Sequence, residues 1–100
     1  MAKALYWYHK AAEQGSIQAQ CDVGFLYQYG EGISKDVTKA VKWYRKAAEE
    51  DNRFALYYLG LCYQNGKGVS KDMTMAVKLY RRAAELGFNL PTEALELLED

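Results

Sequence analysis

The sequence repeats at a fixed offset of 36 residues, and this period restricts the possible folds more than any other feature of the chain. The identical residues at this offset include Tyr27 and Tyr63, Gln28 and Gln64, Gly30 and Gly66, Gly32 and Gly68, Asp36 and Asp72, Ala40 and Ala76, Tyr44 and Tyr80, and Ala47-Ala48 and Ala83-Ala84. A fixed period of roughly 20 to 50 residues is typical of repeat proteins, in which each copy is one supersecondary unit. We therefore predict a single repeat domain over residues 1–100.

Each copy is predicted to contain two helices joined by a turn, which makes the fold class all-α. Apolar residues recur at helical spacing, and a side chain suited to capping precedes each helix of the full copies. The predicted caps are Ser16, Asp36, Asn52 and Asp72, and the predicted helix stops are Gly15, Gly30, Gly66 and Gly87. The predicted units are the second helix of a truncated repeat at 1–15, full repeats at 17–52 and 53–88, and a C-terminal capping helix at 89–100.

Three glycines have particular structural meaning. Gly24 and its equivalent Gly60 lie inside helical patterns, where glycine costs about 1 kcal/mol relative to alanine. The same unfavourable residue in both copies predicts that two helices approach closely at this point. In the first turn, Gly32 is expected to adopt a positive φ, with Ile33 packed beneath the loop.

The third copy begins like the others and then departs from them. Pro91 stands where the full copies have Ala19 and Ala55. Proline suits only the first turn of a helix, so the last helix is predicted to begin near it. Leu95 and Leu98 are expected to continue the apolar stripe. The opposite face is acidic, with Glu93, Glu96, Glu99 and Asp100. One apolar and one polar face is the pattern of a terminal capping unit.

The pattern Ala-x-x-x-(Leu/Val)-Gly-x-x-Tyr-x-x-Gly-x-Gly-(Val/Ile)-x-x-Asp-x-x-x-Ala-x-x-(Trp/Leu)-Tyr-x-x-Ala-Ala runs twice, from Ala19 to Ala48 and from Ala55 to Ala84. It resembles the Sel-1-like repeat, a relative of the tetratricopeptide repeat, and its 36-residue period differs from the 34 residues of the tetratricopeptide form. The resemblance implies antiparallel helix pairs stacked into a right-handed superhelical solenoid, with the first helix of each pair on the concave side. It also implies scaffold or adaptor work, in which the chain binds a partner protein or peptide.

One set of residues beside the packing stripe is a candidate surface for such a partner. Positions spaced i, i+3, i+7 and i+10 share one helix face, and the resemblance places this face on the concave side. The candidate partner-binding residues are Gln18, Cys21, Phe25 and Gln28 in the first copy and Phe54, Tyr57, Leu61 and Gln64 in the second. Leu90, Glu93 and Leu97 are expected to continue this face. Apolar anchors with amides at the rim suit a peptide groove, although packing against neighbouring helices explains the same residues equally well.

The first helix lacks the helix that would precede it in a full repeat. The aromatic residues that recur at the period are expected mainly to form the core, namely Trp7, Tyr8, Tyr27, Trp43, Tyr44, Tyr63 and Tyr80. At the uncovered edge, however, some of Leu5, Tyr6, Trp7 and Tyr8 should be exposed, and an open stack end favours self-association. The alternative function is therefore a structural or self-assembling segment of a larger protein, whose stack ends make the contacts.

No residue set in the sequence favours an enzyme, a metal site or a cofactor. The Gly-x-Gly turns lack the flanking strand and the further residues of phosphate-binding loops. His9 is the only histidine, whereas a zinc site needs about four ligands. Asp36 and Asp72 are a whole repeat apart and each has a capping role, so they do not form a catalytic pair.

Composition narrows the partner class further. The chain has 13 basic and 13 acidic residues, so it lacks the basic footprint of a nucleic-acid-binding protein. No apolar run is long enough for membrane insertion. Cys21 and Cys62 occupy non-equivalent repeat positions, which predicts free thiols rather than a repeated disulfide. Together with the absence of a signal-peptide pattern, this favours a cytoplasmic location.

Overall fold

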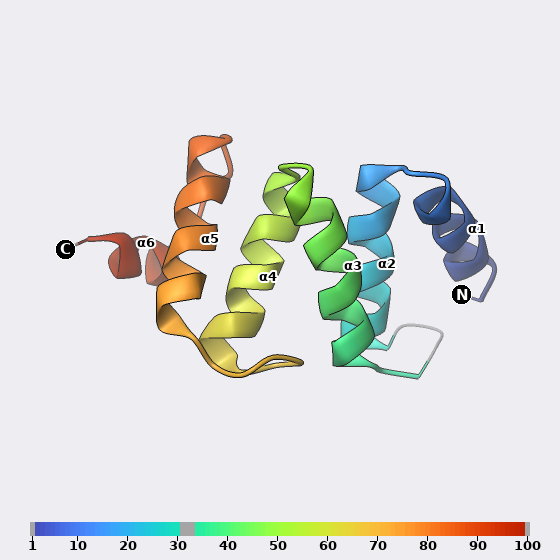
Figure 1. The fold of residues 1–100 in the computed structure, drawn as a ribbon, viewed down its shortest axis with the longest axis horizontal. Helices are drawn as coiled ribbons and strands as arrows, with labels where there is room; N and C mark the ends of the chain where they lie inside the picture. The colour runs from blue at the N-terminus through green and yellow to red at the C-terminus, as the bar shows by residue number, and fades with distance from the viewer. Residues whose placement is uncertain (1, 31–33, 100) are drawn as a thin grey trace.

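The computed structural model describes residues 2–30 and 34–99, and these form six α-helices and no strand. The helices are α1 (Ala2–Glu13), α2 (Ile17–Tyr29), α3 (Val37–Glu49), α4 (Arg53–Asn65), α5 (Met73–Glu85) and α6 (Thr92–Leu98). They follow one another along the long axis of a body of 44 × 23 × 19 Å, with the two termini at opposite ends (Figure 1). The predicted all-α solenoid is confirmed.

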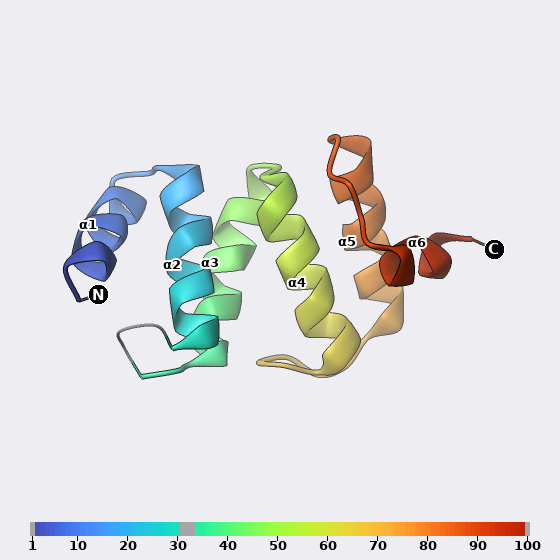
Figure 2. The same ribbon diagram turned by 180° about the vertical axis from the view of Figure 1, so that it is seen from behind.

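Two helix pairs, α2–α3 and α4–α5, make the centre of the stack. In Figure 2, α2 and α4 lie in front of α3 and α5, so each pair contributes one helix to each of two layers. Every helix packs on the next helix in the chain. Because the main contacts are between helices that follow one another in the chain, one pair can extend the core of the previous pair without long-range connections.

All four predicted N-caps are confirmed. The side chains of Ser16, Asp36, Asn52 and Asp72 accept hydrogen bonds from backbone amides three residues further on, at 3.3, 3.1, 2.9 and 3.0 Å. Gly30 and Gly66 end α2 and α4 with φ values of 68° and 65°, which glycine adopts without steric cost. The cap residues therefore determine where the helices begin and end.

The two halves of each pair meet where a tyrosine lies against a glycine. A Cβ atom on Gly24 would be 2.7 Å from Cδ1 of Tyr44, and one on Gly60 would be 2.6 Å from Cε1 of Tyr80. Both tyrosines are fully buried. The predicted close approach of two helices at these glycines is confirmed.

The first turn cannot be compared with its prediction, because Gly32 and Ile33 lie outside the described residues. The equivalent turn of the second copy does show both expected features. Gly68 has a φ of 74°, and Val69 packs against the main core. A Cβ on Gly68 would lie 2.8 Å from the carbonyl oxygen of Val37, so this turn packs closely on α3.

The C-terminal helix corrects one prediction. Pro91 is the N-cap of α6, as expected, but Leu95 is exposed and Ala94 is the buried residue. The equivalents of Leu95 are Val23 and Leu59, which are buried because the second helix of their pair covers them. Within residues 2–30 and 34–99, no later helix covers α6 in this way. The apolar stripe therefore shifts to Ala94, which joins Tyr80 and Leu90 in one cluster.

We predict that Gly60→Ala destabilises the chain even though alanine is the better helix former. The gain in helix propensity is about 1 kcal/mol, whereas forcing a methyl group into a packed core costs typically about 1–3 kcal/mol. Tyr80 cannot move aside easily, because its ring is buried and its hydroxyl is hydrogen-bonded to Gln64. Urea unfolding followed by circular dichroism measures the difference.

The matched control is the same change in a Tyr80→Leu background, where the ring that meets the new methyl group is gone. Gly60→Ala should then be neutral or stabilising. A stability gain of about 1 kcal/mol from Gly60→Ala in the unchanged chain would contradict the role of this contact.

Candidate functional site

A groove of about 380 Å³ separates α2 from α4 on the layer that faces the viewer in Figure 2. It is lined by Gln18, Cys21, Asp22 and Phe25 from α2 and by Asn52, Phe54 and Tyr58 from the start of α4. We call this the α2–α4 groove. Three of its seven lining residues are aromatic, and its polar groups are two amides, one carboxylate, the Tyr58 hydroxyl and the Cys21 thiol.

Neighbouring rings hold the walls of the groove in place. The Phe25 ring lies 4.6 Å from that of Tyr29 and 5.8 Å from that of Tyr58, measured between centroids. Tyr58 in turn stacks on the buried Tyr44 at 5.4 Å. On the other side, Phe54 meets Phe88 edge to face at 5.5 Å, yet it remains 46% exposed. The groove is thus largely preformed, and Phe54 has the most accessible ring in it.

Four of the eight predicted partner-binding residues line this groove, namely Gln18, Cys21, Phe25 and Phe54. Cys21 differs from the expectation, because it is 6% exposed and belongs to the main core cluster. Burial, with a smaller effect of the nearby Asp22 charge, raises the pKa of its thiol to about 12. Cys21 is therefore part of the groove floor and an unreactive thiol rather than an exposed contact residue.

Tyr57 and Leu61 do not line the groove and instead pack against the segment that leads into α6. The Tyr57 ring stacks on Phe88 at 4.8 Å and lies 5.8 Å from that of Tyr80. Leu61 packs on the cluster that contains the buried Leu90, a residue expected to extend the binding face. For Tyr57 and Leu61, the alternative interpretation, packing against neighbouring parts of the chain, agrees with the structure. The C-terminal segment occupies the surface that the second copy would otherwise expose.

Gln28 and Gln64 have an internal function that the sequence did not indicate. Gln28 Oε1 accepts a hydrogen bond of 2.6 Å from the Tyr44 hydroxyl, and Gln64 Oε1 accepts one of 2.5 Å from Tyr80. A buried hydroxyl needs such a partner. The recurrence of glutamine at these positions is therefore explained by the core, and neither residue lines the α2–α4 groove.

Sequence reasoning missed three residues of the groove: Asp22, Asn52 and Tyr58. Asp22 and Tyr58 occupy equivalent repeat positions but differ in chemistry. This difference between the two copies is the sequence feature that could have indicated both residues as part of the groove. Partial burial raises the pKa of the Asp22 carboxyl above its ordinary value. Asn52 was recognised only as a cap, and its position at the start of α4 also places it at the groove.

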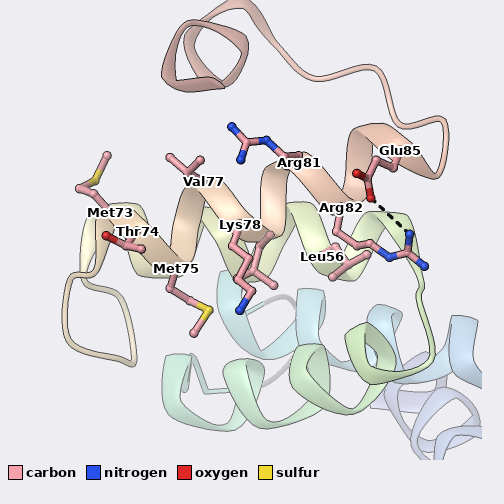
Figure 3. A pocket seen from close by; sticks show the side chains of 10 residues that line it. Leu56, Met73, Thr74, Met75, Val77, Lys78, Arg81, Arg82 and Glu85 are labelled. Carbon is pink, nitrogen blue, oxygen red and sulfur yellow. Dashed lines mark hydrogen bonds and ion pairs between the residues drawn. The ribbon is translucent and has the colours of Figure 1, made fainter. Parts of the chain in front are cut away.

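A hollow of about 890 Å³ lies along the outer surface of α5 and is shown in Figure 3. Met73, Val77, Lys78 and Arg81 are spread along this shallow surface (Figure 3). The residues of α3 equivalent to Met73 and Val77 are Val37 and Val41, which the turn at Gly68 covers. In the described part of the chain, Met73 and Val77 lack the cover that their equivalents on α3 have.

A second groove, of about 370 Å³, lies between α1 and α3 and is lined by Lys39, Lys42 and Lys46 together with Trp43, Tyr27, His9 and Glu13. His9 meets the Trp43 ring at 5.1 Å, and its Nδ1 atom is 3.6 Å from Glu13.

Among the described residues, no group of three or more His, Cys, Asp or Glu side chains could hold a metal ion. Within the same residues, no helix is both long and apolar enough to cross a membrane.

α1 exposes Trp7 and Tyr8, whose repeat equivalents Trp43 and Tyr44 are buried. Trp7 is 62% exposed, whereas the equivalent Trp43 is 8% exposed and packs on Ala12, Ala19 and Val23. Tyr6 and Tyr8 are 57% and 43% exposed. Trp7 and Tyr8 are therefore not core residues here, because no helix among the described residues covers them. The side chain of Leu5 lies outside the described residues.

Comparison with known proteins agrees with this architecture. The Sel1 repeat profile matches residues 1–16, 17–52 and 53–88. A Sel1 repeat protein from Oxalobacter formigenes is 48% identical with a TM-score of 0.79, over 83% of this chain and 34% of that one. The protective antigen c5321 of uropathogenic Escherichia coli, which displays an SLR fold, is 40% identical with a TM-score of 0.82, over 84% of this chain and 18% of that one.

A third solved structure is similar over almost the whole chain. Cysteine-rich protein B of Helicobacter pylori (hcpB) is 30% identical with a TM-score of 0.83, over 96% of this chain and 70% of that one. A search of curated proteins finds no match. The chain thus spans about a third and about a fifth of the length of the first two relatives. With two complete helix pairs, repeated tyrosine–glycine contacts and a profile match over most of its length, this chain belongs to the Sel1 repeat family.

Proposed function

We propose that this chain is a protein-interaction module that holds a partner peptide in the α2–α4 groove. Sel1 repeat proteins are generally scaffolds for protein–protein interaction and typically non-catalytic. The observation that carries the proposal is the groove itself, in which a half-exposed Phe54 lines the same recess as Phe25 and Tyr58. Exposed aromatic rings in a recess are the residues that most often dominate the energy of an interface.

The groove also has the polar groups that a peptide needs. Gln18 and Asn52 carry side-chain amides, which can donate to and accept from a peptide backbone. The Asn52 Oδ1 atom already accepts a hydrogen bond from Ala55, so its amide nitrogen is the group left for a ligand. Since the supporting helices are capped and packed, binding needs little reorganisation of the backbone.

We predict that Phe54→Ala and Phe25→Ala each weaken peptide binding about tenfold or more, because truncating a central aromatic anchor typically costs about 1–3 kcal/mol of binding energy. A displayed library of random 12-residue peptides supplies the ligands, and fluorescence anisotropy measures their affinity. Binding should shift the backbone amide signals of α2 and α4 in NMR spectra.

The matched control is Leu95→Ala, which removes an exposed apolar side chain from α6, away from the groove. It should leave peptide affinity unchanged. Circular dichroism must show that each variant remains folded. If selected peptides bind Phe54→Ala and Phe25→Ala as tightly as the unchanged chain, the groove is not the binding site.

A second candidate function is self-association through α1, which the large exposure of Trp7 relative to Trp43 favours. Burying such aromatic surface against a second copy would release the ordered water around it. The function would then be structural, with the stack ends as contacts. This candidate does not use the α2–α4 groove.

We predict that the chain self-associates at concentrations of hundreds of micromolar and that Trp7→Lys shifts it towards the monomer. A charge on the apolar edge opposes burial, so the change should act without altering the helix content. Sedimentation equilibrium and light scattering measure the mass. A monomer at all concentrations, with or without the substitution, would exclude this function.

A further inference from the structure

We infer that the α2–α4 groove takes a basic side chain of the partner, arginine in preference to lysine, between its aromatic walls, with Asp22 as the counter-charge. This inference rests on the proposed function, because it states which residue type of a bound peptide the groove recognises.

Asp22 is the one charged side chain among the residues that line the groove in the described part of the chain. The ion pairs that the described residues form involve Glu13, Asp51 and Glu85, and none includes Asp22. A partly buried carboxylate without a positive partner loses hydration and gains nothing in return. The raised pKa of Asp22 has burial as its cause, with no cation opposing it. A positive group entering the groove would supply the missing charge.

The rings of the groove add a second attraction for a cation. Phe25, Phe54 and Tyr58 line the same recess as Asp22, and the face of an aromatic ring attracts a cation within about 6 Å. Two such contacts occur elsewhere in the chain, with Lys39 over Tyr27 at 5.5 Å and Lys46 over Trp43 at 5.0 Å. At the groove itself, the Arg53 guanidinium lies over the Phe54 ring at 5.3 Å, so this ring already holds a cation of the chain on one face.

Arg53 does not fill the groove itself. Its Nη1 atom donates a hydrogen bond of 3.4 Å to the backbone oxygen of Leu86, which directs the guanidinium towards the end of α5. Arg53 is also not among the residues that line the groove. The carboxylate of Asp22 is therefore left for a cation that comes from outside the chain.

Other ligand classes fit less well. An acidic peptide would be repelled by Asp22, and an apolar anchor would complete the burial of an unpaired carboxylate. Arginine is preferred to lysine because its planar group can stack on a ring while two of its N–H groups bond one carboxylate. The long aliphatic part of the arginine side chain would lie along the apolar walls.

Only the first copy can offer this site. The residue equivalent to Asp22 in the second copy is Tyr58, which is itself a wall of the groove. The side of α4 that faces α6 is occupied by Phe88 and Leu90. One chain therefore binds one basic side chain in this way, and the difference between the two copies gives the groove its specificity.

We predict that N-acetylarginine methylamide binds the groove about tenfold more tightly than the methylamide of N-acetylnorleucine, which has a similar length and no charge. NMR titration should shift the amide signals of Asp22, Phe25, Phe54 and Tyr58. Asp22→Asn should reduce arginine binding to the norleucine level, and high salt should weaken it only in the unchanged chain. Phe54→Leu should reduce the preference for arginine as well.

The matched control is Glu49→Gln, which removes an exposed carboxylate from α3 outside the groove. It should bind arginine like the unchanged chain. Equal affinity for arginine and norleucine, or arginine binding that Asp22→Asn does not weaken, would overturn the inference.

Library peptides separate this inference from the proposed function. If peptides bind the groove but carry no enriched arginine or lysine and tolerate Asp22→Asn, the inference fails and the proposed function stands. If the arginine amide binds the groove but no peptide does, the cation site stands and the proposed function fails. Enrichment of one basic residue, lost in a selection on Asp22→Asn, supports both.

We further predict that Asp22→Asn raises the melting temperature at pH 7. Since the pKa of Asp22 is higher in the folded chain than in the unfolded chain, the folded state binds more protons between these two values, and stability falls as pH rises through that window. The other titratable groups lining the groove, Cys21 and Tyr58, have pKa values raised further above neutrality by burial, so they stay uncharged there.

The stability difference between Asp22→Asn and the unchanged chain should disappear near pH 3, where the carboxyl is protonated in both states. Thermal unfolding followed by circular dichroism at both pH values measures it. If Asp22→Asn lowers the melting temperature at pH 7, the carboxylate is stabilised within the chain and is not waiting for an external cation.

Discussion

The contact of Tyr44 with Gly24, repeated by Tyr80 with Gly60, is the interaction on which the rest of the structure depends. It joins the two helices of a pair at a distance that leaves no room for a Cβ atom. The tyrosine hydroxyl reaches through the pair to a glutamine on the first helix, so the buried polar atom is satisfied. Three residue types at fixed spacing therefore specify how each pair packs.

This constraint also shapes the α2–α4 groove. Tyr58 stacks on Tyr44 at 5.4 Å, and Phe25 meets Tyr58 from the preceding pair. The packing tyrosine of one pair thereby supports a wall of the groove. The surface proposed for partner binding is thus supported directly by a buried tyrosine of the core, and its aromatic walls can stay ordered without a ligand.

The fold could be predicted well from the sequence because its determinants are local. Capping by Asp36 and Asp72, and the close approach at Gly24, depend on residues within one copy. The groove could be predicted only in part. Gln18, Phe25 and Phe54 were found by helix periodicity, which says which face a residue shares but not what covers that face.

The misplaced residues show what periodicity leaves out. Cys21 and Leu95 were assigned from the repeat pattern alone, yet one is buried and the other exposed. Their exposure depends on whether a neighbouring unit covers them, and that information lies outside the copy in which they stand. Tyr57 and Leu61 are covered by Phe88 and Leu90, which belong to the irregular segment after the last full pair.

Asp22 shows how a repeat scaffold can acquire specificity at low structural cost. A carboxylate in this position does not help the stack, since burial raises its pKa and the described residues provide no cation for it. The second copy has Tyr58 there, which packs on Tyr44 and contributes to the core. The same backbone position thus stabilises the fold in one copy and, in the other, leaves a carboxylate in a recess of aromatic side chains. The repeated tyrosine–glycine contacts hold both pairs in the same geometry, so the fold can tolerate one unfavourable group, the Asp22 carboxylate. A cationic ligand that pairs with this carboxylate would gain binding free energy by removing that unfavourable state.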